Sequence, residues 1–395
     1  MDKKCIILKR EGKILSLVFH GNRLVRAGAE DEGGGILGRI HIARVKDVVN
    51  SIHAAFVEIQ PGVRCFLSLR EVRKPLLLNR EYDGRLLAED ELLVQVNKEA
   101  IGNKPPSVTC NVSLDGKYCV LSLGKPGISY SAKLSAKARV RIAKGLEDGE
   151  RGMDKFGIII RTNARDLQEE LAPLREEICR LSGTMEELLR IAPFRTCFSL
   201  LYEKPPAYLT GLRDMYAGQY EEILTDDREI FEKISVFSGM HPEFALPPAR
   251  LYQDVRLPLG RLYGVEKHLQ QALGRKVWMR SGGYLIIEPT EALTVIDVNS
   301  GKAETGKRGE EAYFRINMEA AEEIAVQLAL RNISGIIVID FISMAGEEER
   351  RRLMAHFGDL LKRDAVRSRL VDITALGLVE VTRMKISRPL KEQLG

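Results

Sequence analysis

Two carboxylates in the carboxy-terminal third of the chain lie in similar sequence contexts. These contexts suggest that the two form a pair that shares a cation or a proton. Asp297 lies in the run Thr-Val-Ile-Asp-Val-Asn and Asp340 ends the run Ile-Ile-Val-Ile-Asp, and both runs are rich in β-branched residues. Such runs predict buried strands, in which a carboxylate is rare unless it has a partner. Asn299 follows Asp297 by two residues, so on a strand the two side chains point to one face.

The two carboxylates converge if their strands are neighbours. At about 4 Å they would repel by roughly 4 kcal/mol at an effective dielectric of about 20, so the pair requires a cation or a shared proton. A hard divalent ion with oxygen ligands fits, and Mg²⁺ takes only one or two carboxylates and keeps its waters. The alternative is that each Asp separately pairs with an arginine or caps a helix. One Asp alone would favour that alternative, but two in matched settings beside Asn299 favour a metal site.

The segment between the two runs predicts that their strands are parallel neighbours. A glycine-rich basic loop, Gly301–Gly309, leads into a helix expected from about 310 to 330, whose apolar side chains keep a three-to-four spacing. Strand, helix and strand make a βαβ-like unit. The loop lacks the Walker A register. Its basic residues Lys302, Lys307 and Arg308 either meet a polyanion or are simply solvated.

Composition excludes several classes of protein. The 395 residues favour two or more domains, and 45% apolar with 29% charged residues is typical of a soluble globular protein. A net charge of +5 is too small to establish a polyanion partner. The six scattered cysteines form no Cys-x-x-Cys, which argues against a standard zinc site or a disulfide scaffold. With no signal peptide and no apolar run of about 20 residues, we expect a cytoplasmic protein without a transmembrane segment.

The region from 36 to about 110 predicts a small closed barrel such as an OB-fold, because about five short strands are punctuated by Gly and Pro. Phe56 and Phe66 fall on adjacent predicted strands, and Lys98 and Lys104 follow. Aromatic rings with nearby lysines hold single-stranded nucleic acid, because bases stack for about 1–3 kcal/mol each and lysines meet phosphate. Taken alone, however, a Phe in a strand is more often barrel core.

A strand that ends at Arg161-Thr162 precedes a long helical pattern, from about 166 to 191, in which Pro173 predicts a kink. A guanidinium fork, a hydroxyl and a helix start together make an anion pocket. The residues alone favour the simpler interpretation, a surface Arg with a Thr N-cap. Residues 1–34 alternate as hairpin strands but are too short to fold alone. We therefore expect them to join residues 207–272, which look helical with loops, in one discontinuous domain.

The chain resembles the bacterial ribonuclease E/G family over nearly its whole length, most weakly around 207–272. The motifs that carry the resemblance are Ser281–Gly301, Asn317–Arg331, Gly335–Ile342 and Ala375–Arg383, with Ala54–Val57, Leu93–Glu99 and Gly157–Thr162 upstream.

The resemblance implies an α/β and β multi-domain fold. A ribonuclease H-like domain (1–34 with 207–272) is interrupted by an OB-fold RNA-binding domain (35–110) and a 5′-sensor region (111–206). A deoxyribonuclease I-like α/β catalytic domain (273–395) follows.

The resemblance also implies a Mg²⁺-dependent endoribonuclease, with Mn²⁺ as a substitute, that is specific for single-stranded RNA. It would act in rRNA maturation and mRNA turnover, prefer 5′-monophosphorylated RNA, and leave 5′-phosphate and 3′-hydroxyl ends. Asp297 and Asp340 would bind the metal, and Asn299 would orient a ligand or the attacking water. The implied RNA-binding residues are Phe56, Phe66, Lys98 and Lys104, and the implied 5′-phosphate sensor is Gly127, Arg161 and Thr162, with Arg367 as a weaker candidate.

One departure from the family concerns zinc. Relatives usually carry a Cys-rich motif shortly after the segment matching 383–390, and this sequence has no such cysteines, so structural zinc is not expected. A homodimer through the catalytic domain stays open. Two alternatives also stay open: a non-catalytic RNA-binding protein of the same fold, and a metal-dependent phosphatase or deoxyribonuclease that uses the same two carboxylates.

Overall fold

The computed structural model describes residues 3–72, 74–100, 104–146, 154–167, 171–214, 220–301 and 307–395, without the side chains of 307–310. The chain forms two compact units. The first consists of Met1–Glu32, Ala217–Met240 and Pro247–Gly395, and the second of Gly33–Tyr216 and His241–Leu246. The assignment of four domains stays a prediction.

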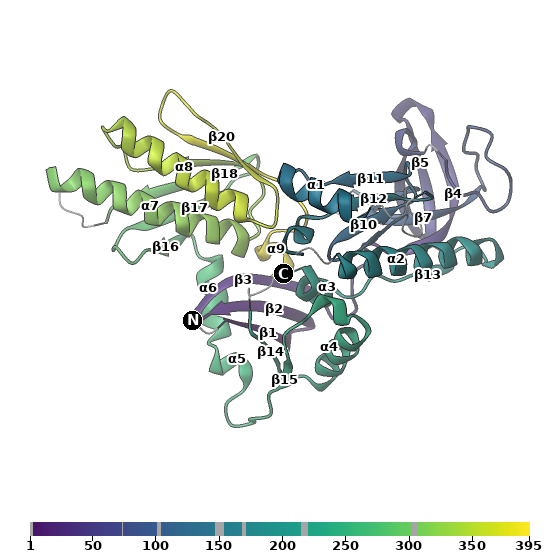
Figure 1. Ribbon diagram of the computed structural model, residues 1–395, viewed down its shortest axis with the longest axis horizontal. Coiled ribbons are helices and arrows are strands. Elements are labelled where there is room, and N and C mark those ends of the chain that lie inside the picture. Colours follow the sequence, from purple (N-terminus) through teal and green to yellow (C-terminus); the bar gives the residue numbers. More distant parts are fainter. Residues whose placement is uncertain are drawn as a thin grey trace. The chain divides into compact units, whose positions relative to one another are not determined.

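The first unit contains a five-stranded sheet in the order β15-β14-β1-β2-β3 (Figure 1). Hairpins join β1, β2 and β3, whereas β14 lies parallel to β1 and to β15. The amino-terminal strands therefore pair with a segment more than 200 residues away, in which helices and loops were expected but no strands. The elements are β1 (Lys3–Arg10), β2 (Lys13–His20), β3 (Arg23–Asp31), β14 (Glu222–Thr225), β15 (Ala249–Leu251), α4 (Arg228–Met240), α5 (Leu259–Leu262) and α6 (Val265–Leu273).

A second sheet in the first unit, the mixed sheet, has the order β16-β17-β18-β19-β21-β20. Its central pair, β18 and β19, is parallel and is joined by α7, which is the predicted strand–helix–strand arrangement. Lys302 and the side chains of Lys307 and Arg308 lie outside the described residues. The elements are β16 (Lys276–Trp278), β17 (Tyr284–Pro289), β18 (Leu293–Asn299), α7 (Lys307–Leu330), β19 (Gly335–Asp340), α8 (Glu347–Arg363), β20 (Ser368–Ile373), β21 (Val379–Arg383) and α9 (Leu390–Leu394).

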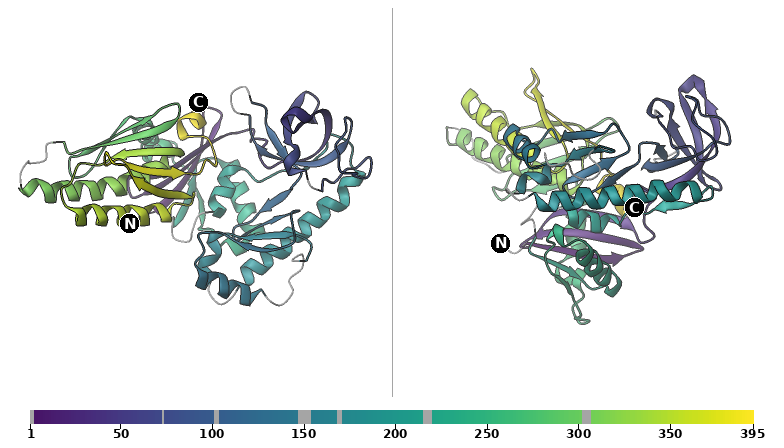
Figure 2. Two further views of the ribbon diagram at one scale, coloured as in Figure 1. Left: turned by 90° about the horizontal axis from the view of Figure 1, so that it is seen from above. Right: turned by 45° about the vertical axis from the view of Figure 1, so that its right-hand side comes forward.

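Helices cover one face of the mixed sheet. Figure 2 shows α7 and α8, in green and yellow-green, running side by side against it. Ile296 and Val298 of β18 and Ile337 and Ile339 of β19 are buried on that face with Leu353 and Phe357 of α8. Because side chains alternate along a strand, the residues between them point to the opposite face of the sheet.

The second unit contains a closed five-stranded barrel, because β4 pairs with both β5 and β7. This closure agrees with the predicted OB-fold. β13 (Leu200–Tyr202) adds to the outer edge of β4. The barrel strands are β4 (Ile40–Val49), β5 (Ala54–Gln60), β6 (Val63–Ser68), β7 (Glu91–Lys98) and β8 (Ser107–Thr109).

The described residues of the second unit also form a four-stranded sheet, β11-β12-β10-β9, and the α-helices α1, α2 and α3. The predicted kink at Pro173 is wrong. α2 begins at Ala172, so the proline occupies the first turn, where its missing N–H removes no helical hydrogen bond. The elements are β9 (Ser113–Asp115), β10 (Cys119–Ser122), β11 (Gly127–Tyr130), α1 (Ala136–Gly145), β12 (Gly157–Ile160), α2 (Ala172–Ile191) and α3 (Ala207–Asp214).

Glu177 of α2 ties this helix to the turn before β10. Its fully buried carboxylate accepts hydrogen bonds from the backbone N–H of Lys117 at 2.6 Å, Tyr118 at 2.7 Å and Cys119 at 3.0 Å. Gly116 has no room for a Cβ, because the carboxylate lies against it. The turn therefore depends on one side chain for three of its donors.

All six cysteines are free thiols. Within the ranges that the structure describes, no helix combines the length and the apolar character needed to cross a membrane.

We predict that Glu177→Ala destabilises the protein by roughly 3 kcal/mol, since each buried donor left without an acceptor costs about 1–3 kcal/mol. Urea unfolding followed by circular dichroism measures the change. Glu176→Ala is the matched control, because Glu176 precedes Glu177 on α2 but is exposed, and it should stay within about 0.5 kcal/mol of wild type. Equal effects of the two substitutions would contradict the role of Glu177.

Candidate functional site

Asp297 and Asp340 are direct partners on neighbouring strands. The parallel register of β18 and β19 pairs Leu293 with Ile336 and ends with Asp297 opposite Asp340. Adjacent strands lie about 4.8 Å apart, so the two carboxylates share one rung at the carboxyl ends of both strands. The structure thus brings together the two residues that the sequence singled out.

The strands are buried on one face only, which corrects the expectation that they are buried throughout. Asp297 and Asn299 are half-buried and Asp340 is exposed, whereas their neighbours Ile296 and Ile339 are fully buried. The pair therefore lies on the face opposite α7 and α8. On that open face a solvated ligand can reach the carboxylates.

Asn299 fixes the orientation of Asp297. Its Nδ2 donates a hydrogen bond of 2.7 Å to Oδ2 of Asp297, which occupies one carboxylate oxygen and leaves Oδ1 and the Asp340 carboxylate on the open face. The side-chain oxygen of Asn299, Oδ1, would offer a cation a further oxygen ligand. The orienting role expected for Asn299 is compatible with this geometry.

Asn317 holds the segment after Asp340 in place, and the sequence analysis assigned it no role. This fully buried residue of α7 donates from Nδ2 to the Ile342 carbonyl at 2.8 Å and accepts at Oδ1 from the Ile342 N–H at 3.0 Å. The clamp acts two residues beyond Asp340. The position of Asn317, a polar residue within the apolar stripe of the helix, was the sequence signal that could have identified it.

The turn before β17 supports the other side of the site. A Cβ on Gly283 would lie 2.8 Å from the backbone oxygen of Asn299, and a Cβ on Gly301 would clash with the Gly282 carbonyl. Gly301 also has a φ of +66°, which favours glycine. These glycines allow the turn to pack directly on the end of β18.

The side chains at and beside this rung include two carboxylates and the amide of Asn299, each of which can offer an oxygen ligand. Hard divalent cations take such ligands, and Mg²⁺ in particular needs only one or two carboxylates. Among the described residues, no cluster of three or more His, Cys, Asp or Glu side chains is placed to hold a metal. The residues present therefore fit a cation that retains several waters.

Phe56 and Phe66 lie on the outer surface of the barrel rather than in its core. They are cross-strand partners on β5 and β6, with ring centroids 6.2 Å apart in an edge-to-face arrangement. Both are half-buried, whereas Val57 and Cys65 beside them are fully buried in the core. The interpretation that the residues alone favoured, barrel core, is wrong.

The pairing register extends this aromatic row toward a lysine. Phe66 pairs with Ser107 of β8, and Ser107 pairs with Lys98 at the end of β7. Lys98 and Lys104 are both exposed. A hollow of about 1210 Å³ borders Phe56 and is lined in part by the basic residues Lys46, Arg64 and Arg85. The two rings and Lys98 thus lie in one cross-strand row on the outside of the barrel.

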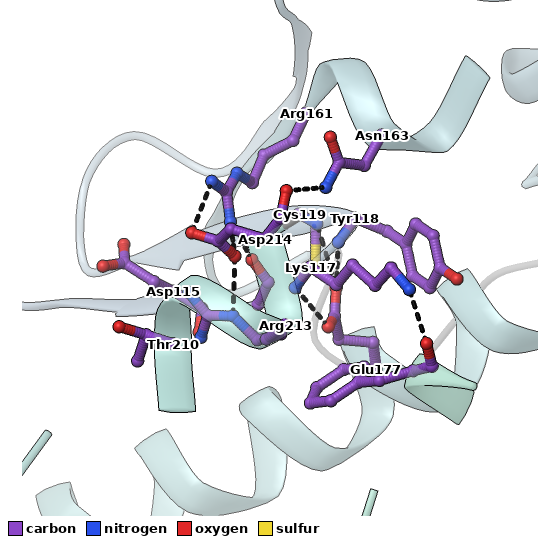
Figure 3. Close-up of polar contacts among 12 residues, drawn as sticks. Asp115, Lys117, Tyr118, Cys119, Arg161, Asn163, Glu177, Thr210, Arg213 and Asp214 are labelled. Atoms are coloured by element: carbon purple, nitrogen blue, oxygen red, sulfur yellow. Dashed lines mark hydrogen bonds and ion pairs between the residues drawn. The ribbon is translucent and has the colours of Figure 1, made fainter. Parts of the chain in front are cut away.

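Arg161 is held by a carboxylate of its own unit (Figure 3). Its Nη1 and Nη2 donate to Oδ1 and Oδ2 of Asp214 at 2.9 Å and 3.0 Å, and Nη1 also contacts the Gly116 carbonyl. Burial alone would raise the pKa of Asp214, but Arg213 and Arg161 outweigh it and lower that pKa. The sequence analysis missed Asp214 because it lies 53 residues from Arg161.

The remaining predicted sensor residues are placed as follows. The Thr162 hydroxyl is 3.0 Å from that of Ser131. Gly127 is exposed at the start of β11 with a φ of +125°, and a Cβ there would meet nothing. Arg367 is exposed in the first unit. The arrangement gives Arg161 a bidentate fork that matches phosphate as well as carboxylate.

Known proteins are similar to this chain over most of its length. The sequence profile of the Ribonuclease E/G family matches residues 113–386. Ribonuclease E of Synechocystis sp. is 34% identical over 372 residues, which are 92% of this chain and 54% of that protein. For ribonuclease E of Nostoc sp. the identity is 34% over 371 residues, 91% of this chain and 52% of that protein.

Ribonuclease G of Escherichia coli strain K12 is 31% identical over 371 residues, which are 91% of this chain and 75% of that protein. The chain thus spans about half the length of the two ribonuclease E relatives and three quarters of the ribonuclease G relative.

Proposed function

The chain belongs to the ribonuclease E/G family, and from this premise we propose that it is a metal-dependent endoribonuclease that cuts single-stranded RNA. The observation that carries the proposal is the shared rung of Asp297 and Asp340 on the open face of the mixed sheet. We further propose Mg²⁺ as the ion, with Mn²⁺ as a substitute, because every donor at the rung is oxygen.

The roles of the chain's own residues follow from their geometry. Asp297 and Asp340 would hold the cation, and Asn299 orients the Asp297 carboxylate through the 2.7 Å hydrogen bond. A bound divalent cation supplies Lewis-acid stabilisation of charge on the scissile phosphate. Asn317 fixes the exit of β19 through Ile342 and so limits the movement of Asp340. Hydrolysis by this route leaves a 5′-phosphate and a 3′-hydroxyl.

We propose that the outer side of the barrel holds the RNA strand. Phe56 and Phe66 offer ring faces to bases, and Lys98 and Lys104 offer charge to phosphates. Stacking and phosphate contacts read little sequence, so preference among RNA sequences should be weak. Binding should weaken by about 0.7 log units per neutralised phosphate for each tenfold rise in salt.

In the proposed 5′-phosphate sensor, a terminal monophosphate replaces Asp214 as the partner of Arg161. Asp214 now occupies the Arg161 fork, and a terminal monophosphate carries the same paired oxygens with more charge. Gly127 and Thr162 belong to the proposed sensor, and Arg367 stays the weaker candidate that the family resemblance implies. A physiological role in rRNA maturation and mRNA turnover, and assembly as a homodimer, belong to the same proposal.

We predict that Asp297→Asn lowers the rate of RNA cleavage by at least about a hundredfold, since even residues that only support a metal ligand are worth about 10–100-fold. The assay is cleavage of a short single-stranded RNA in Mg²⁺. Asp359→Asn, an exposed carboxylate on α8 that pairs with Lys362, is the matched control and should keep wild-type activity.

RNA cleavage by the Asp297→Asn variant at the wild-type rate would contradict the assignment of Asp297 as a metal ligand. RNA binding without cleavage by either protein would instead identify a non-catalytic RNA-binding protein. Offering DNA and a phosphomonoester beside RNA separates a deoxyribonuclease and a phosphatase from the proposed enzyme.

A separate prediction concerns the RNA terminus. Wild-type protein should cut a 5′-monophosphorylated RNA faster than the same RNA with a 5′-hydroxyl, and Arg161→Ala should erase the difference by removing the fork. The measurement is the ratio of the two cleavage rates. Arg190→Ala, an exposed arginine on α2 of the same unit, should leave the ratio unchanged. Equal rates in the wild-type protein would refute the sensor.

A further inference from the structure

An aromatic pair with a lysine lies at the edge of the mixed sheet. β16 is the edge strand and adjoins β17, which in turn adjoins β18 (Figure 1). Lys276 and Trp278 come from β16, and Tyr284 comes from β17. None of the three belongs to the active site or the barrel surface described above.

The pairing register places these side chains on the same face as the carboxylates. Trp278 pairs with Tyr284, which pairs with Asn299, and the next rung runs from Lys276 through Ile286 to Asp297. Leu285 and Val298 alternate with these residues and are buried on the helix-covered face. Tyr284 is therefore one strand spacing, about 4.8 Å, and Trp278 two spacings, on the order of 10 Å, from the Asp297 strand.

The three side chains contact one another closely. The rings of Trp278 and Tyr284 have centroids 5.2 Å apart at an interplanar angle of 60°. The Lys276 ammonium lies 3.9 Å from the centroid of Trp278 and 3.6 Å from that of Tyr284. Trp278 is nevertheless 64% exposed, so most of the indole is open to a ligand.

A purely structural role explains only part of this arrangement. A cross-strand aromatic pair stabilises an edge strand, and a lysine there discourages pairing with other chains. Neither role requires an indole that is left mostly exposed on the open face, beside the proposed cleavage site. Stacking a base needs such a ring, and a nearby ammonium meets the adjoining phosphate.

We propose that Trp278, Tyr284 and Lys276 form a stacking subsite that holds one nucleobase of single-stranded RNA next to the Asp297–Asp340 rung. The inference rests on the proposed function and adds to it a contact made by the unit that carries the carboxylates. Because every base has a stacking face, the subsite is tolerant of sequence. It acts by holding the strand across the open face near the scissile phosphate.

The single tryptophan of the chain makes the test direct, since intrinsic tryptophan fluorescence reports Trp278 alone. The 395-residue chain is titrated with an end-labelled oligoadenylate of about 12 nucleotides, a length within the site sizes of single-strand binders. EDTA in the buffer prevents metal-dependent cleavage. Anisotropy of the label gives the Kd, and tryptophan emission is followed in parallel with unlabelled RNA. We expect saturable quenching with the same Kd. Inorganic polyphosphate, which has charge but no bases, should quench little.

Variants separate stacking from folding. Trp278→Ala should weaken RNA binding about tenfold, within the range that alanine produces at stacking aromatics, and Trp278→Phe should retain most of the affinity. Phe194→Ala, which removes an 83% exposed ring of the other unit, should change nothing. Thermal unfolding of each variant checks that the fold is kept.

Two results would overturn the subsite alone: RNA binding measured by anisotropy with no change in tryptophan emission, or quenching by polyphosphate equal to that by RNA. Absence of RNA binding in the anisotropy assay would overturn the proposed function together with the subsite.

Discussion

Asp297 and Asp340 carry like charges on directly paired residues of parallel strands, and such a pair at about 4 Å costs roughly 4 kcal/mol at an effective dielectric of about 20. The fold places that cost at one rung, where the two strands pair directly. Buried side chains on the other face of β18 and β19, packed under α7 and α8, hold the two strands in register. Asn299 orients the Asp297 carboxylate, and Asn317 holds the backbone at Ile342, two residues after Asp340. The proposed divalent cation would offset this repulsion.

In the proposed function, the residues for RNA recognition and those for cleavage come mainly from different units of the chain. The barrel surface around Phe56 and the Arg161 fork belong to the second unit, and the carboxylates belong to the first. In the second unit, the residues proposed to contact RNA also contact other residues of that unit. Phe56 packs on Phe66, and Arg161 binds Asp214. The proposed stacking subsite at Trp278 would give the first unit its own contact with the strand, independent of the barrel.

Much of the site could be predicted from the sequence because its signals are local. Single carboxylates in β-branched runs, an intervening amphipathic helix and the two-residue spacing of Asn299 led to the observed rung. Features that depend on tertiary context could not be predicted. A hydrophobic run does not say which face of a strand is covered, so Asp340 was expected to be buried and is exposed. Phe56 was the opposite case, since a Phe in a strand usually points inward and this one does not. Asp214 pairs with Arg161 although the two residues are 53 positions apart in the sequence, and no local sequence pattern predicts such a pairing.

The central claim is that Asp297 and Asp340 together bind one divalent cation, and calorimetric titration of the RNA-free protein with Mg²⁺ tests it most directly. The account predicts one site in the wild-type protein that disappears in Asp297→Asn and equally in Asp340→Asn, while Asn299→Ala retains the site with an affinity about 10–100-fold lower. An unchanged stoichiometry and affinity in the Asp297→Asn, Asp340→Asn double variant would contradict it.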